Sequence, residues 1–324
     1  MDVQKNQRLA NCMAMMQVIE ANGSASRKDI ADKTGLSLMT VGKMCSILEE
    51  GGIIEEAKAE KSECGRRASI CSATSALAAC VINLADNVYT LTVYTPSGRP
   101  AASFIHTSPA DSSLDDKLFL FADRMADMLE RISYIPPERV CVVTDLNYSD
   151  GIISDSLGNR ADLRRAVDKI FKGKPLHVYS VAGCAAAYLE KNGRDESVAA
   201  VIGKELSFSL PASGNTPFEC LSVFPRSLRV DGVSLDERLK MAGTPDKECV
   251  FAFLAAISAF YPNRKIAIFP LAESNGAMTC GEMCRFAVRG ADIGERCTSR
   301  TDPLGDISEG ARVLLLADII KKHI

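Results

Sequence analysis

The sequence predicts an α/β chain in two parts: a short helical unit at the N-terminus and a larger region in which strands and helices alternate. Three observations predict this division. Apolar residues recur at helical spacing up to about residue 50, strand-length apolar runs begin near residue 78, and the stretch 71–76 between them is small and polar. A length of 324 residues also favours more than one domain.

The composition is typical of a globular protein and excludes several other classes. Hydrophobic residues make up 47% of the chain and charged residues 24%, which excludes a disordered tail, a collagen-like rod and a disulfide-dense mini-protein. Apolar runs stay well short of the ~20 residues that a membrane span requires, and residues 1–5 lack the basic-then-apolar pattern of a signal peptide. We therefore expect a cytoplasmic protein without membrane contact, whose 12 cysteines are small buried hydrophobic residues.

Charge alone does not indicate a nucleic-acid partner. Up to residue 72, ten Lys and Arg balance ten Asp and Glu, whereas a nucleic-acid binder usually shows a basic surface. The two signs nevertheless separate along the chain, since basic stretches at 27–43 and 58–67 flank an acidic stretch at 49–56. One face of this unit could therefore meet a phosphate backbone.

The N-terminal unit is predicted to contain three helices and a two-stranded hairpin. The first helix has apolar residues at three- and four-residue spacing, namely Leu9, Cys12, Met13, Met16 and Ile19. Asn22-Gly23 ends it, because both residues tolerate left-handed backbone. Ser26 caps a short helix over 27–33, and Gly35 marks the turn after it.

The third helix begins after Ser37 and has one apolar and one mixed face. The apolar positions, which should face the core, are Val41, Met44, Cys45 and Leu48. The opposite face carries Met39, Gly42, Lys43 and Ser46. Gly51-Gly52 ends the helix, and extended segments on either side of the polar stretch 58–65 form a hairpin. This order of elements is that of a winged helix-turn-helix, with three helices of a larger domain as the alternative.

The motif assigns contacts to DNA. The residues expected to contact it are Arg27, Ser37, Leu38, Met39, Thr40, Lys43, Arg66 and Arg67. The capped start of the third helix should present its first turn to the major groove, with Lys43 one turn further on. Arg27 should bind phosphate, and the wing arginines should enter a narrow minor groove or remain in a solvated turn. Gly42 either permits a closer approach to the duplex or reflects drift on an exposed face.

Beyond residue 76 the chain alternates strands and helices in two similar halves. Expected strands lie at 78–84, 89–95, 101–107, 140–144, 176–179, 198–202, 206–210 and 265–269. Expected helices lie at 114–132, 161–171, 182–191, 247–260 and 307–322. Three strands, then alternating helices and strands, then a similar half, is the arrangement of two-lobed actin-like, ribonuclease-H-like folds.

These segments together resemble the ROK family, which includes repressors and sugar kinases. The resemblance is carried by "SRKDIADKTGLS" and "GRRASI" in the first unit, and by "CVINLADNVYTLTVYTPSG" and "VYSVAGCAAAYLEK" beyond it. It implies a transcriptional regulator with a winged helix-turn-helix at 1–72 and a ROK domain at 76–324, whose lobes are expected at about 76–192 and 193–324. The implied partners are double-stranded operator DNA, a carbohydrate-like effector and a second copy of the chain.

The kinase motifs of the family are missing from this chain. Where ROK kinases have an Asp-x-Gly-x-Thr phosphate loop, residues 83–87 are Asn-Leu-Ala-Asp-Asn, without the glycine or the hydroxyl. Val181 and Ala182 stand where the family has Asn-Asp, so no carboxylate is left there to take a proton from a sugar hydroxyl. The family's zinc-binding His and Cys cluster has no counterpart between residues 203 and 250. We therefore expect no enzymatic activity, no cofactor and no metal.

Two alternatives remain open. One is an active ROK-type sugar kinase with a DNA-binding extension, which the missing carboxylate argues against. The other is a regulator whose C-terminal domain is only a dimerisation scaffold. Asp145 and Asp150 flank a turn near the expected cleft and are either weak candidates for ligand binding or parts of an ordinary capped turn. The apolar helices 250–260 and 311–320 are either a dimer surface or core.

Overall fold

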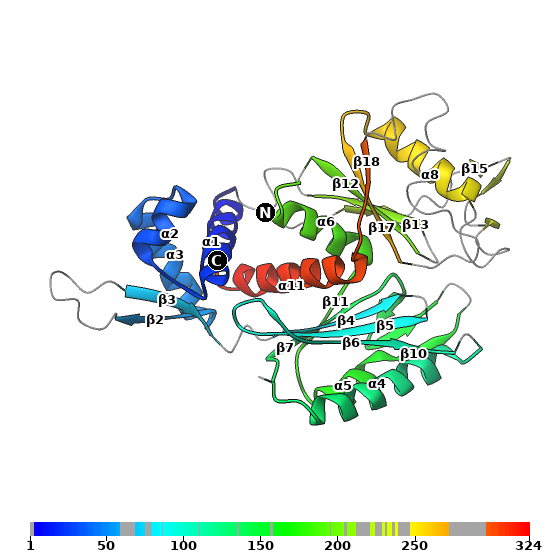
Figure 1. Cartoon of the computed structure of the whole chain (residues 1–324), viewed down its shortest axis with the longest axis horizontal. Coiled ribbons are helices and arrows are strands. Elements are labelled where there is room, and N and C mark those ends of the chain that lie inside the picture. The colour runs from blue at the N-terminus through cyan, green and yellow to red at the C-terminus, as the bar shows by residue number, and fades with distance from the viewer. Residues whose placement is uncertain are drawn as a thin grey trace.

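Three bodies and one central helix make up the chain (Figure 1). A helical unit with a small sheet lies at the N-terminal end, and two five-stranded sheets with their helices form most of the rest. Helix α11 (Pro303–Lys321) lies between the two large sheets and reaches the N-terminal unit with its C-terminal end. The computed structural model describes residues 3–58, 69–74, 79–85, 87–109, 111–134, 136–155, 158–194, 196–203, 206–211, 221–223, 229–230, 232–234, 237–238, 247–271 and 296–324.

The N-terminal unit has the predicted helices and hairpin, and one further strand. Its helices are α1 (Val3–Asn22), α2 (Arg27–Thr34) and α3 (Leu38–Glu50). Its sheet has the order β1-β3-β2, in which the strands are β1 (Ser24–Ser26), β2 (Ile54–Lys58) and β3 (Ser69–Ala73). The predicted ends of α2 are confirmed, because Ser26 forms a capping box with Asp29 and Gly35 adopts left-handed backbone with a φ of 71°.

The first large sheet has the strand order β11-β7-β4-β5-β6. Its strands are β4 (Ala79–Ala85), β5 (Val88–Tyr94), β6 (Pro100–Thr107), β7 (Arg139–Val143) and β11 (Leu176–Tyr179). The first three form an antiparallel meander, and β7 runs parallel to both β4 and β11. Helices α4 (Leu114–Glu130) and α5 (Leu163–Ile170) cover one face and bury apolar side chains such as Phe121 against it.

A small antiparallel sheet, which the sequence does not predict, lies between β7 and α5 along the chain. Its three strands are β8 (Asn147–Ser149), β9 (Ile152–Ser154) and β10 (Arg160–Asp162). The helix predicted at 161–171 therefore starts late, because β10 pairs with β9 before the helix begins. Strands of three residues are too short to show the alternation on which sequence prediction depends.

The second large sheet has the order β14-β13-β12-β17-β18. Its strands are β12 (Ser197–Ile202), β13 (Leu206–Leu210), β14 (Leu221–Val223), β17 (Lys265–Pro270) and β18 (Cys297–Ser299). Helix α8 (Lys247–Phe260) packs on this sheet, and a two-stranded hairpin lies beside it, formed by β15 (Arg229–Val230) and β16 (Val233–Ser234).

Two helices, α6 (Val181–Lys191) and α11, cross closely between the large sheets. A Cβ atom at Gly310 of α11 would overlap the carbonyl oxygen of Cys184 in α6, so only glycine permits this approach. Side chains of both sheets, of the N-terminal unit and of these two helices form one continuous apolar cluster. The packing of α11 therefore connects all three bodies.

The two apolar helices considered as a dimer surface are both part of the core. The residues Cys249, Val250, Phe253, Leu254 and Ile257 of α8 are buried against the second sheet, and α11 is buried on nearly all sides. Packing within the chain therefore accounts for α11 and for these residues of α8, while Phe260 at the end of α8 is 75% exposed. None of the described helices is both long and apolar enough to cross a bilayer.

Candidate nucleic-acid interface

One face of helix α3 is buried in the core of the N-terminal unit, and the opposite face is exposed. Its inner side chains are buried in the unit's core, namely Val41, Met44, Cys45 and Leu48, as predicted. Its first turn is fixed because the Ser37 hydroxyl accepts the N–H of Thr40 at 3.1 Å. Leu38 and Met39, in the same turn, are 60% and 72% exposed. Both side chains are therefore available for contact with a partner.

Arg27 lies beside α3 but is paired with a carboxylate. Its guanidinium donates to Glu56 of β2 at 2.5 Å, and this hydrogen bond raises the pKa of Arg27. A Cβ atom at Gly42 would be 3.6 Å from Arg27 Nη1, so the guanidinium lies against the bare backbone of α3. The sequence predicts Arg27 at the start of the second helix as a phosphate contact but does not predict its carboxylate partner, which comes from β2.

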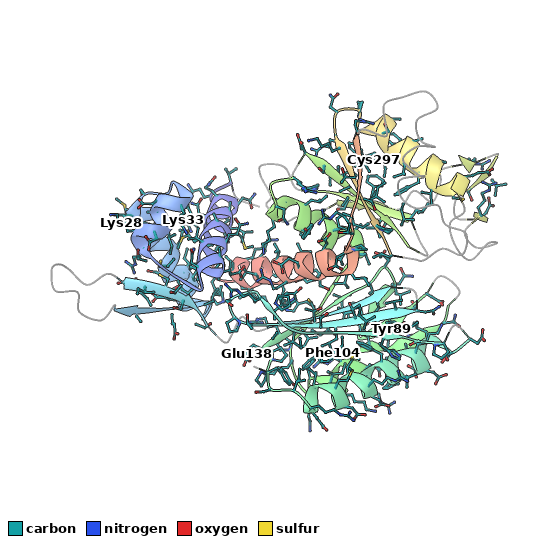
Figure 2. The ribbon with its side chains drawn as sticks, viewed as in Figure 1. Lys28, Lys33, Tyr89, Phe104, Glu138 and Cys297 are labelled. Atoms are coloured by element: carbon teal, nitrogen blue, oxygen red, sulfur yellow. The ribbon has the colours of Figure 1, made fainter. Side chains whose placement is uncertain are left out.

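Two further lysines are exposed on α2. These are Lys28 and Lys33 (Figure 2), and Lys33 donates to the side-chain oxygen of Asn22 at 3.0 Å. The strands of the wing are antiparallel, with Lys58 opposite Ser69. Arg66 and Arg67, which the sequence predicts in its turn, lie outside the described residues.

A buried cluster of charges, missed at the sequence level, joins the N-terminal unit to the rest of the chain. Arg312 of α11 donates two hydrogen bonds to Glu20 of α1, at 2.7 and 2.8 Å. Arg312 also binds Glu309, which accepts from Lys191 of α6. Glu20 and Arg312 are separated by 292 residues in the sequence, so no local pattern could reveal the pair.

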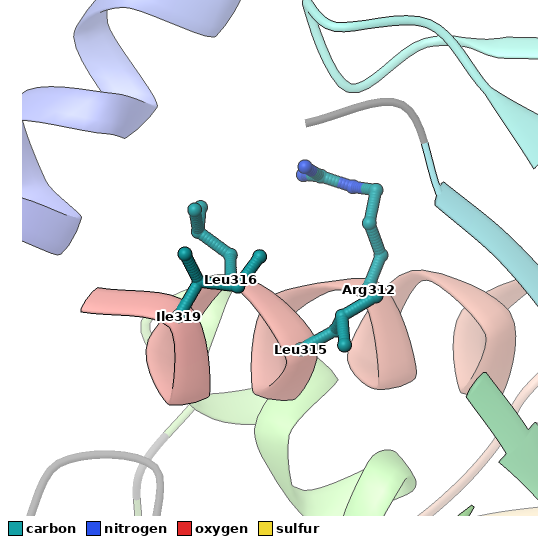
Figure 3. A pocket seen from close by; sticks show the side chains of 4 residues that line it. All are labelled: Arg312, Leu315, Leu316 and Ile319. Carbon is teal, nitrogen blue, oxygen red and sulfur yellow. The ribbon is translucent and has the colours of Figure 1, made fainter. Parts of the chain in front are cut away.

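A small cavity lies along α11 next to this cluster (Figure 3). It is lined by Arg312, Leu315, Leu316 and Ile319 and has a volume of about 10 Å³. That volume is close to the minimum for a single water molecule. The cavity is therefore far too small for a sugar.

The N-terminal unit matches a known DNA-binding family. The family model described as winged helix-turn-helix DNA-binding matches residues 13–55, which run from the middle of α1 into β2. These residues are a winged helix-turn-helix. Leu38, Met39 and Lys43 therefore lie on its recognition helix, and β2 and β3 are the strands of its wing.

The fold of the whole chain also has solved relatives. A ROK family transcriptional regulator, a homologue of the E. coli Mlc protein, is 14% identical, with a TM-score of 0.57 and coverage of 98% of each chain. Lmo2764 from Listeria monocytogenes, named a candidate N-acetylmannosamine kinase, is 13% identical, with a TM-score of 0.51 and coverage of 74% of this chain and 99% of its own. The chain has the ROK fold. A search of curated protein sequences finds no match.

Val181 and Ala182, expected at the positions of the Asn-Asp of ROK kinases, have internal packing roles. Val181 and Ala182 are buried at the start of α6. The carboxylate of Asp145 accepts the N–H of Val181 at 3.1 Å and so binds the first turn of that helix. In the segment expected at the place of the phosphate loop, the side-chain oxygen of Asn87 accepts a hydrogen bond from Lys117 at 2.9 Å.

Asp150, the other ligand candidate, also has a local structural role, and so does His106. Asp150 and Gly151 form the turn between β8 and β9, with φ angles of 51° and 85°, and Ser149 donates to the Asp150 carboxylate at 3.2 Å. His106 is buried and packs against the rings of Tyr89 and Phe121, and burial lowers its pKa. Among the described residues, no cluster of three or more metal-ligating side chains occurs.

Proposed function

We propose that this chain regulates transcription by binding a specific DNA sequence, and that it acts as a repressor. The observation that carries the proposal is the first turn of α3, where Leu38 and Met39 project from a helix whose opposite face is packed. Side chains in this position reach base edges in the major groove, and Lys43 follows one turn later. The winged helix-turn-helix and the ROK fold support the proposal.

Selection of duplexes from a random pool tests this proposal. The full chain should enrich one sequence, and Met39→Ala should lose most of the preference for it over a scrambled duplex. Ile105→Ala is the matched control, because Ile105 is 70% exposed but lies on β6 in the first large sheet. If the wild type enriches no sequence, or if both variants lose preference equally, the assignment of α3 as the recognition helix is wrong.

We infer that the ROK region does not phosphorylate sugars. Phosphoryl transfer needs a positioned acceptor for the hydroxyl proton, and the corresponding positions hold the buried apolar side chains of Val181 and Ala182. The chain should therefore release no ADP in response to sugars. Sugar-dependent ADP release above a heat-killed control would establish the alternative, an active kinase with a DNA-binding extension.

We propose that the ROK region, residues 76–324, instead senses a carbohydrate-like effector. A ligand that binds only the folded state raises the apparent stability, so a thermal-shift screen of sugars, amino sugars and sugar phosphates should identify stabilising compounds. If no compound in the screen stabilises the chain, the alternative of a dimerisation scaffold gains support.

We also propose a homodimer, because paired half-sites on DNA match two-fold symmetry. Light scattering should give about twice the chain mass of 34.9 kDa. A mass of one chain, both with and without DNA, would remove this part of the proposal.

A further inference from the structure

Two thiols touch inside the winged helix-turn-helix. The sulfur atoms of Cys45, on the recognition helix α3, and Cys71, on the wing strand β3, are 3.7 Å apart. Both side chains are fully buried and both are free thiols. This contact joins the two elements on which recognition of DNA depends in the proposed function.

The position of Cys71 makes the contact structurally important. Strand β3 is the middle strand of the small sheet, with β1 and β2 on its two sides. Cys71 pairs with Ala25 of β1 and with Glu56 of β2. A covalent bond from Cys71 to α3 would therefore fix the recognition helix to the centre of the sheet.

The surroundings favour ionisation of one of the two thiols. The hydrogen bond with Cys71 lowers the pKa of Cys45, burial opposes this effect, and the nearby Arg27 guanidinium lowers the pKa further. The same hydrogen bond and burial raise the pKa of Cys71. Because the thiolate is the nucleophilic form, this direction favours Cys45 as the attacking thiol and Cys71 as the resolving thiol.

We propose that Cys45 and Cys71 are a dithiol site that a peroxide oxidises reversibly to a disulfide, and that this oxidation weakens DNA binding. The second part rests on the proposed function, whereas the first part does not. The described structure corresponds to the reduced form, in which both thiols are free. Transient local opening of the small unit gives a molecule as small as hydrogen peroxide access to the buried sulfurs.

The oxidation balances in two steps. The Cys45 thiolate attacks one peroxide oxygen, the O–O bond breaks, and the product is a sulfenic acid and, after proton uptake, one water. The Cys71 sulfur then attacks the Cys45 sulfur, forms the S–S bond and expels hydroxide, which takes up the thiol proton and leaves as a second water. Overall, one peroxide is reduced to two waters and two thiols become one disulfide. A small thiol such as dithiothreitol reverses the change.

Formation of the bond must bring the two sulfur atoms closer together. A disulfide holds its sulfur atoms about 2.05 Å apart, so the present 3.7 Å separation must shrink by more than an ångström. Neighbouring side chains of α3, such as Val41 and Leu48, are closely packed and resist this shift. Because a closely packed interior transmits strain, we expect the shift to reach the exposed first turn, which carries Leu38 and Met39.

Peptide mapping of the full chain tests the site itself. After treatment with hydrogen peroxide, alkylation and digestion without reductant, we expect a linked pair of peptides that contain Cys45 and Cys71 and have lost two hydrogens. Dithiothreitol should remove the link, and Cys45→Ala or Cys71→Ala should prevent it. Cys141→Ala is the matched control, because Cys141 is buried in β7 of the first large sheet, and it should leave the link intact. Alkylation of both thiols after peroxide, or a link from Cys45 to another cysteine, would overturn the proposal.

DNA binding tests the consequence. On the duplex selected with the reduced chain, oxidation should weaken binding about tenfold or more, which corresponds to the loss of about one base contact, and dithiothreitol should restore it. Cys71→Ala should bind equally with and without peroxide. If this variant does not fold, Cys71→Val provides the same test with an apolar side chain.

An intact link with unchanged affinity would overturn the proposal that oxidation weakens DNA binding. Failure of the reduced wild type to prefer any duplex would contradict the proposed function, while the map decides the dithiol site independently.

Discussion

Glu20 and Arg312 form a buried ion pair between the winged helix-turn-helix and the helix that lies between the two large sheets. Two hydrogen bonds of 2.7 and 2.8 Å join them, and their side chains are only 9% and 7% exposed. The guanidinium also lies over the ring of Tyr94 from β5, 5.7 Å from its centre. Because two buried charges gain little net stability over well-packed apolar residues, the main effect of the pair is to define how the DNA-binding unit is placed on the ROK region.

Removal of one partner should therefore be costly. Arg312→Met leaves the Glu20 carboxylate buried without its cation, and we expect a loss of about 3–5 kcal/mol in the free energy of unfolding. The double variant Glu20→Gln/Arg312→Met should recover part of this loss, because no unpaired charge remains. Urea unfolding of the three proteins measures both effects.

An exposed ion pair provides the control for this experiment. Lys265 and Glu196 are 2.8 Å apart, but their side chains are 66% and 64% exposed. Lys265→Met should change the free energy of unfolding by less than about 1 kcal/mol. An equal effect at the two pairs would show that burial does not determine the cost at Arg312.

The same cluster predicts how stability depends on pH. Burial raises the pKa of Glu309, but the hydrogen bonds and charges of Arg312 and Lys191 outweigh it and leave the pKa below its ordinary value of 4.5. A carboxyl with a lowered pKa stabilises the folded state above its ordinary pKa and loses this contribution as the pH falls through the folded value. The wild type should therefore exceed Glu309→Gln in stability near neutral pH, and the difference should shrink below pH 4.5. A difference that stays constant into the acid range would contradict the assigned shift.

Gly42 offers a test of the two interpretations of glycine in the recognition helix. A Cβ atom there makes only an ordinary contact with Arg27 Nη1, at 3.6 Å. Gly42→Ala should therefore stabilise the chain by up to about 1 kcal/mol, because alanine is the better helix former. If DNA binding is unchanged in this variant, glycine is not needed for close approach to the duplex. A loss of affinity with a gain in stability would show that the duplex comes close to this backbone.

The pairing of Arg27 with Glu56 sets the expected effect of each residue on DNA affinity. Glu56→Gln removes the competing carboxylate, so Arg27 becomes available to phosphate and binding should strengthen on all sequences. The slope of affinity against salt should become steeper by about one unit, since one more counterion is released. Arg27→Ala should weaken binding uniformly and flatten the slope. If Glu56→Gln leaves the slope unchanged, Arg27 does not reach phosphate.

Sequence patterns predict the helices and strands of this chain better than the contacts between side chains that are distant in the sequence. The caps at Ser26 and Ser37 and the inward residues of α3 follow from local hydrogen bonding and helical periodicity, and the structure confirms them. The pairings of Arg27 with Glu56 and of Glu20 with Arg312 are long-range, and no spacing rule encodes them. Local patterns likewise identify α8 and α11 as apolar helices. They do not reveal that the two large sheets cover the apolar faces of these helices.

Substitution of Lys43 distinguishes a contact to a base edge from a contact to phosphate. It is exposed on the outer face of α3, one turn beyond Met39. A contact to a base edge costs about 1–3 kcal/mol on the selected duplex when it is removed and little on scrambled DNA, whereas a phosphate contact weakens both alike. We expect Lys43→Ala to weaken binding to the selected duplex and to change binding to scrambled DNA little.

Lys172→Ala is the matched control, because Lys172 is an exposed lysine in the turn after α5, beside the first large sheet. Titration of both variants on the two duplexes at several salt concentrations measures the difference. Equal weakening on both duplexes by Lys43→Ala would assign Lys43 to the backbone and leave the first turn of α3 to carry base recognition.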